Sequence, residues 1–276
     1  MNKLTRAELL AGYRGKIAAG RPIIGGGAGT GLSAKCAEEA GLDFIVIYNS
    51  GRYRMAGRSS MAGLMPYGDA NAIVMDMGSE ILPLTRSVPV MAGVCGTDPF
   101  RDIPRFLDQV RAAGFAGVQN YPTVCLFDGI IRANLEETGL GFYREVEMIE
   151  AARERDLVTL AYVHSEDEAT AMAQAGADIL VPHMGLTTSG LIGARTSLSL
   201  DESVDLVTRL RDAIFAVDDD AVVICHGGPI ATPEDARHIL SKVDGIVGFL
   251  GASSMERLPT EVAMTDHMRS FHAIAD

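Results

Sequence analysis

The sequence lacks the features that mark secreted and membrane-spanning proteins. Its 276 residues include four cysteines, which form no C-x-x-C pair and are too sparse to indicate a framework of disulfide bonds. This usage predicts a reducing, cytoplasmic compartment. The first twenty residues carry charges throughout and no apolar core, so no signal peptide is expected. No apolar run approaches the roughly 20 residues that a membrane-spanning helix needs.

Positive charge is also scarce. The chain has 24 lysines and arginines against 36 acidic residues, which gives a net charge of −12. Nucleic-acid-binding proteins take much of their affinity from a basic surface, so no nucleic-acid partner is expected. The same balance offers no bulk attraction for an anionic substrate. Local donors must therefore hold any phosphate or carboxylate group.

Eight short apolar, β-branched segments alternate with helical patterns along the chain. They are Pro22–Gly26, Asp43–Tyr48, Val88–Val94, Ala116–Gln119, Leu157–Val163, Asp178–His183, Ala221–His226 and Gly245–Leu250. Such alternation predicts βαβ units, and eight repeats close into a barrel more readily than they extend an open sheet. We predict one α/β domain over residues 1–276, a (β/α)8 TIM barrel. Leu4–Ala19 is its N-terminal capping helix, or a helix that packs against a partner. A doubly wound sheet is the alternative.

Loop lengths indicate where the functional site lies. The turns from helix to strand are short, whereas the loops Asn49–Asp69, Asn120–Gly141 and Met184–Leu200 follow strands. In a barrel those loops share one face, and that face holds the active site. Helix starts are predicted at three capping patterns: Asp98-Pro99, Ser165 with Glu168, and Thr232-Pro233 with Asp235.

Three histidines end predicted strands. His164, His183 and His226 close strands five, six and seven. Neutral imidazoles that converge from neighbouring strands suit general acid–base catalysis or metal binding. The alternative is that they only cap the core. We predict His226 and His183 as the catalytic pair.

Two glycine- and serine-rich segments predict anion binding. The last strand runs into GASSMERLP, where Pro259 is expected to stop a short extra helix before a final helix from Thr260. Many barrels bind phosphate at such a helix, here through Gly251, Ala252, Ser253 and Ser254. Gly227 and Gly228, after strand seven, offer further backbone amides. Tight turns without a ligand are the alternative.

Charged side chains also lie in the predicted loops. Arg52, Arg54 and Arg58 follow strand two and suit a clamp for carboxylate or phosphate. Their alternative role is salt bridging to a neighbouring subunit. Asp69 and Asp98 are candidate catalytic carboxylates or helix N-caps.

Long stretches of the chain resemble a known family. They include GGGAGTGLSAKCAE, IYNSGRYRMAGRSSMAGLMPYGDANAIV, AGVCGTDPF, GFAGVQNYPTV, NLEETGLG, HMGLTTSG, CHGGPIATPEDA and GASSMERLPTE. The chain resembles the phosphoenolpyruvate hydrolase-like family of TIM-barrel signal-transduction proteins. Relatives of this domain form the C-terminal part of a plant virus-resistance protein. The family is distantly similar to the phosphoenolpyruvate mutase and isocitrate lyase superfamily.

The resemblance implies a substrate loop and a metal. Ser50-Gly51 and, further along, Asp69 match the superfamily's substrate-binding pattern, which implies substrate contact at Ser50 and Gly51. The superfamily also implies Mg2+ bound by acids at the end of strand three. Here Ala92, Val94 and Cys95 stand in that region, so the chain departs from the metal-binding pattern.

These observations predict an enzyme that hydrolyses a phosphoenolpyruvate-like or phosphonopyruvate-like C3 acid. Its substrate would be held by Ser50, Gly51, Arg52, Arg54 and the glycine- and serine-rich turns. Two alternatives stay open: a C–C lyase acting on a small keto acid, and a non-catalytic sensor of a small anion. No lysine ends a strand, which argues against a Schiff-base aldolase. A homo-oligomer is expected.

Overall fold

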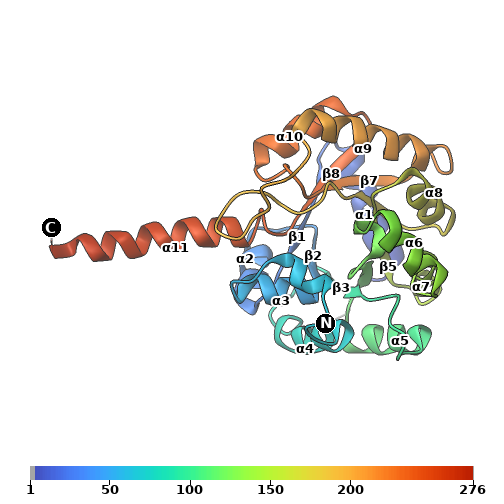
Figure 1. The fold of residues 1–276 in the computed structure, drawn as a ribbon, viewed down its shortest axis with the longest axis horizontal. Coiled ribbons are helices and arrows are strands. Elements are labelled where there is room, and N and C mark those ends of the chain that lie inside the picture. The colour runs from blue at the N-terminus through green and yellow to red at the C-terminus, as the bar shows by residue number, and fades with distance from the viewer. Residues whose placement is uncertain (1–3, 276) are drawn as a thin grey trace.

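Residues 4–275 form a closed barrel of eight parallel strands in a computed structural model (Figure 1). Each strand pairs with the next along the chain, and β8 pairs back with β1. The strands are β1 Ile23–Gly27, β2 Phe44–Ile47, β3 Val90–Val94, β4 Gly117–Asn120, β5 Val158–Val163, β6 Ile179–Pro182, β7 Val222–His226 and β8 Ile246–Gly251. The predicted TIM barrel is confirmed, and every predicted strand lies within two residues of an observed one.

Helices surround the strands because each strand is buried on both of its faces. All six residues of β5 are buried, for example, so both the barrel interior and a helical layer must cover them. The helices of this layer are α2 Gly31–Glu39, α4 Ala70–Ile81, α5 Ile103–Ala113, α7 Tyr143–Arg153, α8 Glu166–Gln174, α9 Leu200–Phe215 and α10 Pro233–Lys242.

The helix starts agree with the predicted caps at two places and differ at one. Ser165 with Glu168 and Thr232 with Asp235 form capping boxes. Asp98, however, is not a helix cap. α5 begins at Ile103, and Asp102 is its N-cap. Pro104 lies in the first turn of α5, so the helix signal is displaced by a few residues from Asp98-Pro99.

The N-terminal helix closes the bottom of the barrel, as predicted. α1, Arg6–Ala18, buries Leu9 and Tyr13. Its Arg6 pairs with Asp178, and its Lys16 pairs with Asp43. These two acids precede β6 and β2, so α1 lies at the amino ends of the strands, opposite the long loops.

The C-terminal segment differs from the prediction. No separate short helix ends at Pro259. Instead α11 runs from Arg257 through Pro259 to His272 and is followed by the short 3-10 helix η3, Ala273–Ala275. Proline is tolerated in a first helical turn because its missing N–H has no helical partner there. Most of α11 projects away from the barrel (Figure 1).

The long loops contain structure of their own at the carboxyl ends of the strands. Between β2 and α4 lie α3, Asn49–Met55, and the 3-10 helix η1, Ser60–Leu64. Between β4 and α7 lie the 3-10 helix η2, Val124–Leu126, and α6, Gly129–Glu137. Across residues 4–275, no helix combines the length and apolar character needed to cross a membrane.

Candidate active site

A small pocket lies at the carboxyl ends of the strands. Its rings come from five strand ends: Tyr48, Tyr121, Tyr162, His183 and His226. Tyr162 contacts both histidines, with ring centroids 4.7 Å from His183 and 4.9 Å from His226. The cavity volume between these side chains is about 30 Å3, above the roughly 10–15 Å3 that one ordered water needs.

His226 is held in one tautomer by its two hydrogen bonds. Its Nδ1 lies 2.6 Å from the carbonyl oxygen of Leu250, which can only accept, so Nδ1 carries the proton. Its Nε2 therefore accepts a hydrogen bond, and the Tyr162 hydroxyl donates to it over 3.2 Å. This arrangement directs the one lone pair of Nε2 at the Tyr162 hydroxyl, which lines the same pocket.

His183 has the opposite tautomer. Its Nδ1 accepts the backbone N–H of Gly185 at 3.0 Å, so the proton lies on Nε2. The rings of His183 and His226 are 4.6 Å apart and nearly perpendicular. The pocket thus contains one imidazole donor beside one imidazole acceptor. His164, the third strand-end histidine, does not line the pocket, and its Nδ1 lies 2.7 Å from the carbonyl oxygen of His183.

Burial keeps the pocket side chains neutral. It lowers the pKa of His226 to about 4, although the hydrogen bond to Leu250 opposes the shift. Burial, reinforced by His226 and His164, lowers the pKa of His183 well below its ordinary value. Burial also raises the pKa of Tyr162. Both imidazoles and the Tyr162 phenol are consequently uncharged near pH 7.

The fixed charge in the pocket wall is a buried ion pair. Arg54 donates from Nε and Nη2 to Glu256 Oε2, at 2.8 and 2.5 Å. The other oxygen of Glu256 accepts the backbone N–H of Gly29 at 2.6 Å. Both side chains are almost fully buried. The pair therefore joins α3, the loop after β1 and the start of α11, and it places Arg54 beside the pocket.

Hydroxyl groups complete the polar side of the pocket. Ser50 Oγ donates to the Tyr121 hydroxyl at 2.9 Å, which in turn lies 3.4 Å from the carbonyl oxygen of Ser60. Ser60 Oγ is 3.5 Å from Ser253 Oγ. Ser50 and Ser253, predicted from two distant segments, thus meet in one pocket.

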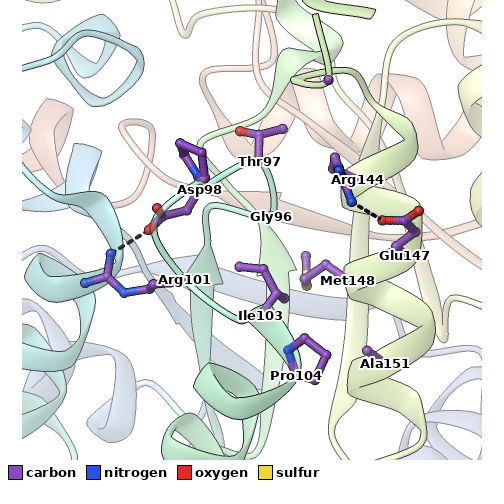
Figure 2. A pocket seen from close by; sticks show the side chains of 12 residues that line it. Gly96, Thr97, Asp98, Arg101, Ile103, Pro104, Arg144, Glu147, Met148 and Ala151 are labelled. Carbon is purple, nitrogen blue, oxygen red and sulfur yellow. Dashed lines mark hydrogen bonds and ion pairs between the residues drawn. The ribbon is translucent and has the colours of Figure 1, made fainter.

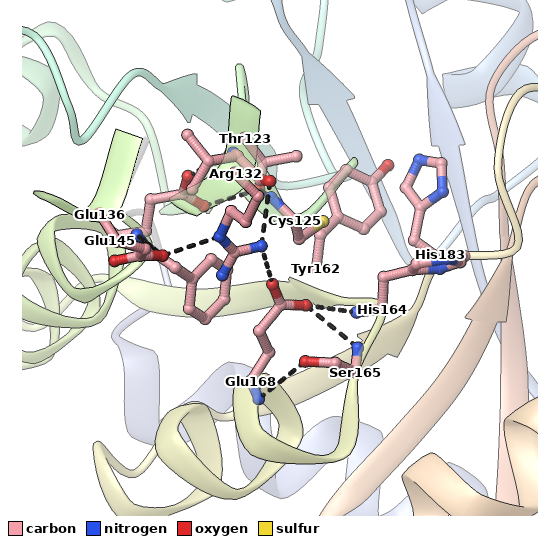
Figure 3. A network of polar contacts seen from close by, with 12 residues as sticks. Thr123, Cys125, Arg132, Glu136, Glu145, Tyr162, His164, Ser165, Glu168 and His183 are labelled. Atoms are coloured by element: carbon pink, nitrogen blue, oxygen red, sulfur yellow. Dashed lines mark hydrogen bonds and ion pairs between the residues drawn. The ribbon is translucent and has the colours of Figure 1, made fainter. Parts of the chain in front are cut away.

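A buried polar network supports the rings from behind (Figure 3). Glu145 on α7 accepts from Asn120 Nδ2, Thr123 Oγ1 and the Val124 amide, each at 2.7 Å. Asn120 Oδ1 accepts the Tyr162 amide at 2.6 Å. Burial raises the pKa of Glu145 to about 8, against the effect of these donors. The network fixes β4 against β5, and with them the positions of Tyr121 and Tyr162.

Two charged residues predicted for the site lie elsewhere. Arg52 pairs with Asp76 at 3.1 Å and with Glu80 at 3.6 Å, outside the pocket. Asp69 caps α4 by accepting the Ala72 amide, and it pairs with Arg101 at 2.6 Å. The structure therefore separates Asp69 from both pocket histidines.

Three of the predicted backbone donors are engaged within the protein. The Ser50 amide donates to Asn49 Oδ1, and the Gly51 amide donates to the Tyr48 carbonyl oxygen. The Gly228 amide donates to the Gly185 carbonyl oxygen at 2.7 Å.

The glycines near the pocket are accounted for by packing. Gly227 has φ 79°, and an added Cβ would lie 2.4 Å from the Gly185 carbonyl oxygen. An added Cβ on Gly251 would meet the Met255 side chain. Ser254 borders a different cavity, on the outer side of the barrel. Turn geometry and packing therefore suffice to require Gly227 and Gly251, and ligand contact at these turns stays a prediction.

Several pocket residues carry no motif that sequence reasoning could recognise. Tyr48, Tyr121, Tyr162, Ser60 and Glu256 were not predicted. A weak signal existed for three of them, because each tyrosine lies at or next to a strand end. Nothing local marks Glu256, whose partner Arg54 lies 202 residues away.

The residues do not fit the Mg2+ that the superfamily implies. Mg2+ prefers an octahedral set of oxygen ligands that includes carboxylates. Among the described residues no carboxylate lines the pocket, and Glu256, behind Arg54, is already engaged by Arg54 and Gly29. Within residues 4–275, no group of three His, Cys, Asp or Glu side chains is placed to hold a metal ion.

Fold and site together define a TIM barrel whose pocket, at the carboxyl ends of the strands, is built from neutral histidines and tyrosines. The family described as phosphoenolpyruvate hydrolase-like matches residues 8–274, and the chain belongs to this family. The family predicted from the sequence motifs is confirmed.

Two plant proteins are similar over nearly the whole chain. The ToMV resistance protein Tm-1(GCR237) of Solanum lycopersicum is 56% identical over 270 residues, which is 98% of this chain and 36% of the relative. The ToMV susceptible protein tm-1(GCR26) of the same plant has the same identity and coverage. The chain therefore spans about a third of the length of these relatives.

Solved structures share the fold at much lower identity. A 2,3-dimethylmalate lyase of the PEP mutase/isocitrate lyase superfamily has a TM-score of 0.62 at 18% identity, covering 99% of this chain and 90% of that one. An oxaloacetate acetylhydrolase has a TM-score of 0.63 at 15% identity, covering 96% and 88%. At such identities the likeness shows the barrel fold alone.

Proposed function

We propose that this chain is an enzyme that hydrolyses a small phosphorylated or phosphono 2-oxo acid, with phosphoenolpyruvate and phosphonopyruvate as test substrates. The observation that carries the proposal is the pair of opposite tautomers in the pocket. His226 Nε2 is an acceptor and His183 Nε2 is a donor, with ring centroids 4.6 Å apart. A proton acceptor beside a neutral donor is what enolate chemistry requires.

Each group has a defined role in the reaction. Arg54 and the Ser50 and Ser253 hydroxyls hold the anionic head. A water displaces the Tyr162 hydroxyl from His226 Nε2, and His226 takes a proton from that water as the water oxygen bonds to phosphorus. The bond from phosphorus to the enol oxygen, or to C3 in phosphonopyruvate, then breaks. His183 donates a hydrogen bond to the enolate oxygen, and the proton on His226 passes to C3, which yields pyruvate and phosphate.

The neutral state of His183 suits this role. An uncharged imidazole N–H stabilises a developing enolate without protonating it in the ground state. The low pKa of His226 makes it a weak base, so general-base catalysis supplies only part of the rate. Positioning by Arg54, the serines and Tyr162 must provide the remainder. None of these steps is routed through a metal ion.

The test is release of pyruvate and phosphate by purified protein, measured with Mg2+ and with EDTA. We expect His226→Asn to lower kcat about 10²- to 10⁴-fold. Tyr162→Phe removes the hydrogen bond to His226 while keeping the ring, and a smaller loss is expected. Tyr67→Phe is the matched control because Tyr67 is exposed.

Other experimental outcomes would identify a different function. Pyruvate formed without phosphate from C4 or C5 keto or hydroxy acids would identify a C–C lyase instead. Binding of these acids without turnover of any substrate, under either metal condition, would identify the non-catalytic sensor. Unchanged turnover in His226→Asn would remove the proposed chemistry altogether.

A further inference from the structure

A second and larger cavity adjoins the reaction pocket. Its volume is about 680 Å3, and its walls come from the loops after β2, β3 and β4. Those loops lie at the carboxyl ends of the strands, on the same face as the histidines. Leu64 at the end of η1 lines both spaces, so the two cavities adjoin at this residue.

The walls of this cavity are mainly apolar. They include Leu64, Met65, Phe127, Ile131, Leu135 and Leu140. Several apolar side chains at its edge remain exposed, with Phe100 at 95%, Ile131 at 59% and Met65 at 47%. Exposed apolar groups are normally scattered, and a cluster that lines a concave surface indicates a binding site.

The charged groups that line the cavity, Asp69, Asp98 and Arg101, pair with one another and leave one negative charge in excess. Arg101 Nη2 lies 2.6 Å from Asp69 Oδ2, and its Nη1 lies 2.5 Å from Asp98 Oδ2. Two carboxylates on one guanidinium leave no free positive charge, so the cavity does not suit a second anionic group. A neutral apolar group fits its chemistry.

The helix that forms one wall is held mainly by polar anchors, with Leu135 as its apolar contact to the core. None of the residues of α6 is buried. Arg132 fastens the helix by donating to Glu168 at 2.5 Å and to the Val124 carbonyl oxygen at 3.2 Å (Figure 3). Ile131 and Leu135 of α6 line the cavity. The structure thus holds an apolar helix surface over a space that no side chain fills.

A neighbouring cleft has a different character. It measures about 390 Å3 and lies between α5 and α7 (Figure 2). Arg101 pairs there with Asp98, and Arg144 pairs with Glu147 at 3.1 Å. It shares no lining residue with the reaction pocket, so we assign it no part in substrate binding.

We infer that the natural substrate carries an apolar alkyl or aryl group, which occupies the cavity lined by Leu64 and α6 while the acid head reacts between His183 and His226. The inference rests on the proposed function and extends it from a C3 acid to a longer 2-oxo acid. It follows from the two volumes. The reaction pocket offers about 30 Å3, whereas the adjoining apolar space offers about 680 Å3.

The test uses calorimetric binding of unphosphorylated 2-oxo acids of increasing length, from pyruvate to 2-oxooctanoate. Each methylene that enters an apolar site tightens binding about fourfold. 2-oxooctanoate has five more methylenes than pyruvate, so we expect it to bind about 10³-fold more tightly if all of them enter the cavity, and about thirtyfold more tightly if half of them do. Ile131→Asp and Met65→Asp should abolish most of this difference and leave pyruvate binding unchanged. Both positions are partly exposed, so both variants should fold.

Two matched controls lie on the same elements. Ile130 is 79% exposed on α6, and Met61 is 43% exposed on η1, and neither lines the cavity. Ile130→Asp and Met61→Asp should keep the chain-length dependence. Equal binding of pyruvate and 2-oxooctanoate by the unmodified protein would overturn the inference while sparing the proposed function. Chain-length dependence that survives in both cavity variants would overturn it as well.

Failure of the proposed function gives a different result. If neither pyruvate nor 2-oxooctanoate binds, the acid-head site itself is wrong. A third outcome concerns a second copy of the chain. If Ile131→Asp lowers the molar mass seen by light scattering and the unmodified protein shows no chain-length dependence, the cavity is an interface between copies, and the ligand inference is wrong.

Discussion

Removing one partner of the buried Arg54–Glu256 pair should destabilise the fold strongly, and Glu256→Gln tests this. The substitution keeps the shape of the side chain and removes its charge. Arg54, with 1% of its side chain exposed, would then remain charged without a counterion. Burial opposes the Arg54 charge, yet Glu256 and Tyr48 hold the pKa of Arg54 above its ordinary value. Glu256→Gln removes that support, but a guanidinium is effectively always protonated in proteins, so Arg54 will stay charged in the variant.

The magnitude follows from this geometry. Breaking a buried pair by removing one partner costs about 3–5 kcal/mol, because the other charge is left desolvated and unpaired. A typical domain has about 5–15 kcal/mol of stability, so the variant should lose a large share of it. Replacing both residues, as Arg54→Met with Glu256→Met, removes both charges and should restore most of the loss.

Urea unfolding followed by circular dichroism measures the effect. Asp266→Asn is the matched control, since Asp266 pairs with Arg269 on the exposed part of α11. An exposed pair of this kind contributes about 0–1 kcal/mol. If Glu256→Gln loses no more than Asp266→Asn, the pair is not holding these segments together. If the double variant is as unstable as the single one, the loss does not come from an unpaired charge.

Three further predictions concern pH, the barrel interior and assembly. The folded pKa of His226 is about 4 against about 6.5 when unfolded, so the unfolded chain binds a proton first as pH falls. The free energy of unfolding should fall by up to about 3 kcal/mol between pH 6.5 and 4. His226→Phe should remove most of this pH dependence, whereas His267→Gln should leave it unchanged. Gln119 is fully buried, and neither its amide oxygen nor its nitrogen has a partner within residues 4–275. Gln119→Leu should therefore raise the urea-unfolding free energy by about 1 kcal/mol, and a loss above about 2 kcal/mol would contradict this account. We propose a homo-oligomer that covers Met264, Met268 and Phe271, which are more than half exposed on α11. Light scattering of the unmodified protein should give a molar mass that is a multiple of 29.3 kDa. The double variant Met268→Lys with Phe271→Lys should have a lower molar mass, and an unmodified protein that is monomeric would refute the proposed oligomer.

Much of the fold was predictable because it follows local periodicity. Each strand is a short β-branched run, and the helices between the strands carry capping boxes at Ser165 and Thr232. The barrel then brings the carboxyl ends of all strands to one edge. This is why the sequence alone places His183 and His226 on the same face. The two histidines lie close together because β6 and β7 are neighbours in the strand order of the barrel.

The errors occurred where two local patterns look alike. Asp98-Pro99 and Asp102 with Pro104 both resemble a helix start, and only packing selected the second. Pro259 was expected to end a helix, but it lies in the first turn of α11, where proline is tolerated. Arg52 and Arg54 are two residues apart on α3, and nothing local distinguishes them. One pairs with acids on α4, and the other points to Glu256 and the pocket.

The sequence by itself determined the barrel, the face that carries the site and the histidines at its strand ends. All three depend on periodicity and strand order, which are properties of short segments. Tertiary structure alone decided which charges are buried, which tautomer each histidine adopts and which tyrosines join them. Those features depend on contacts such as Tyr162 with His226 or Gly29 with Glu256, between residues 64 and 227 positions apart. No local pattern encodes such contacts, because they exist only once the barrel has closed.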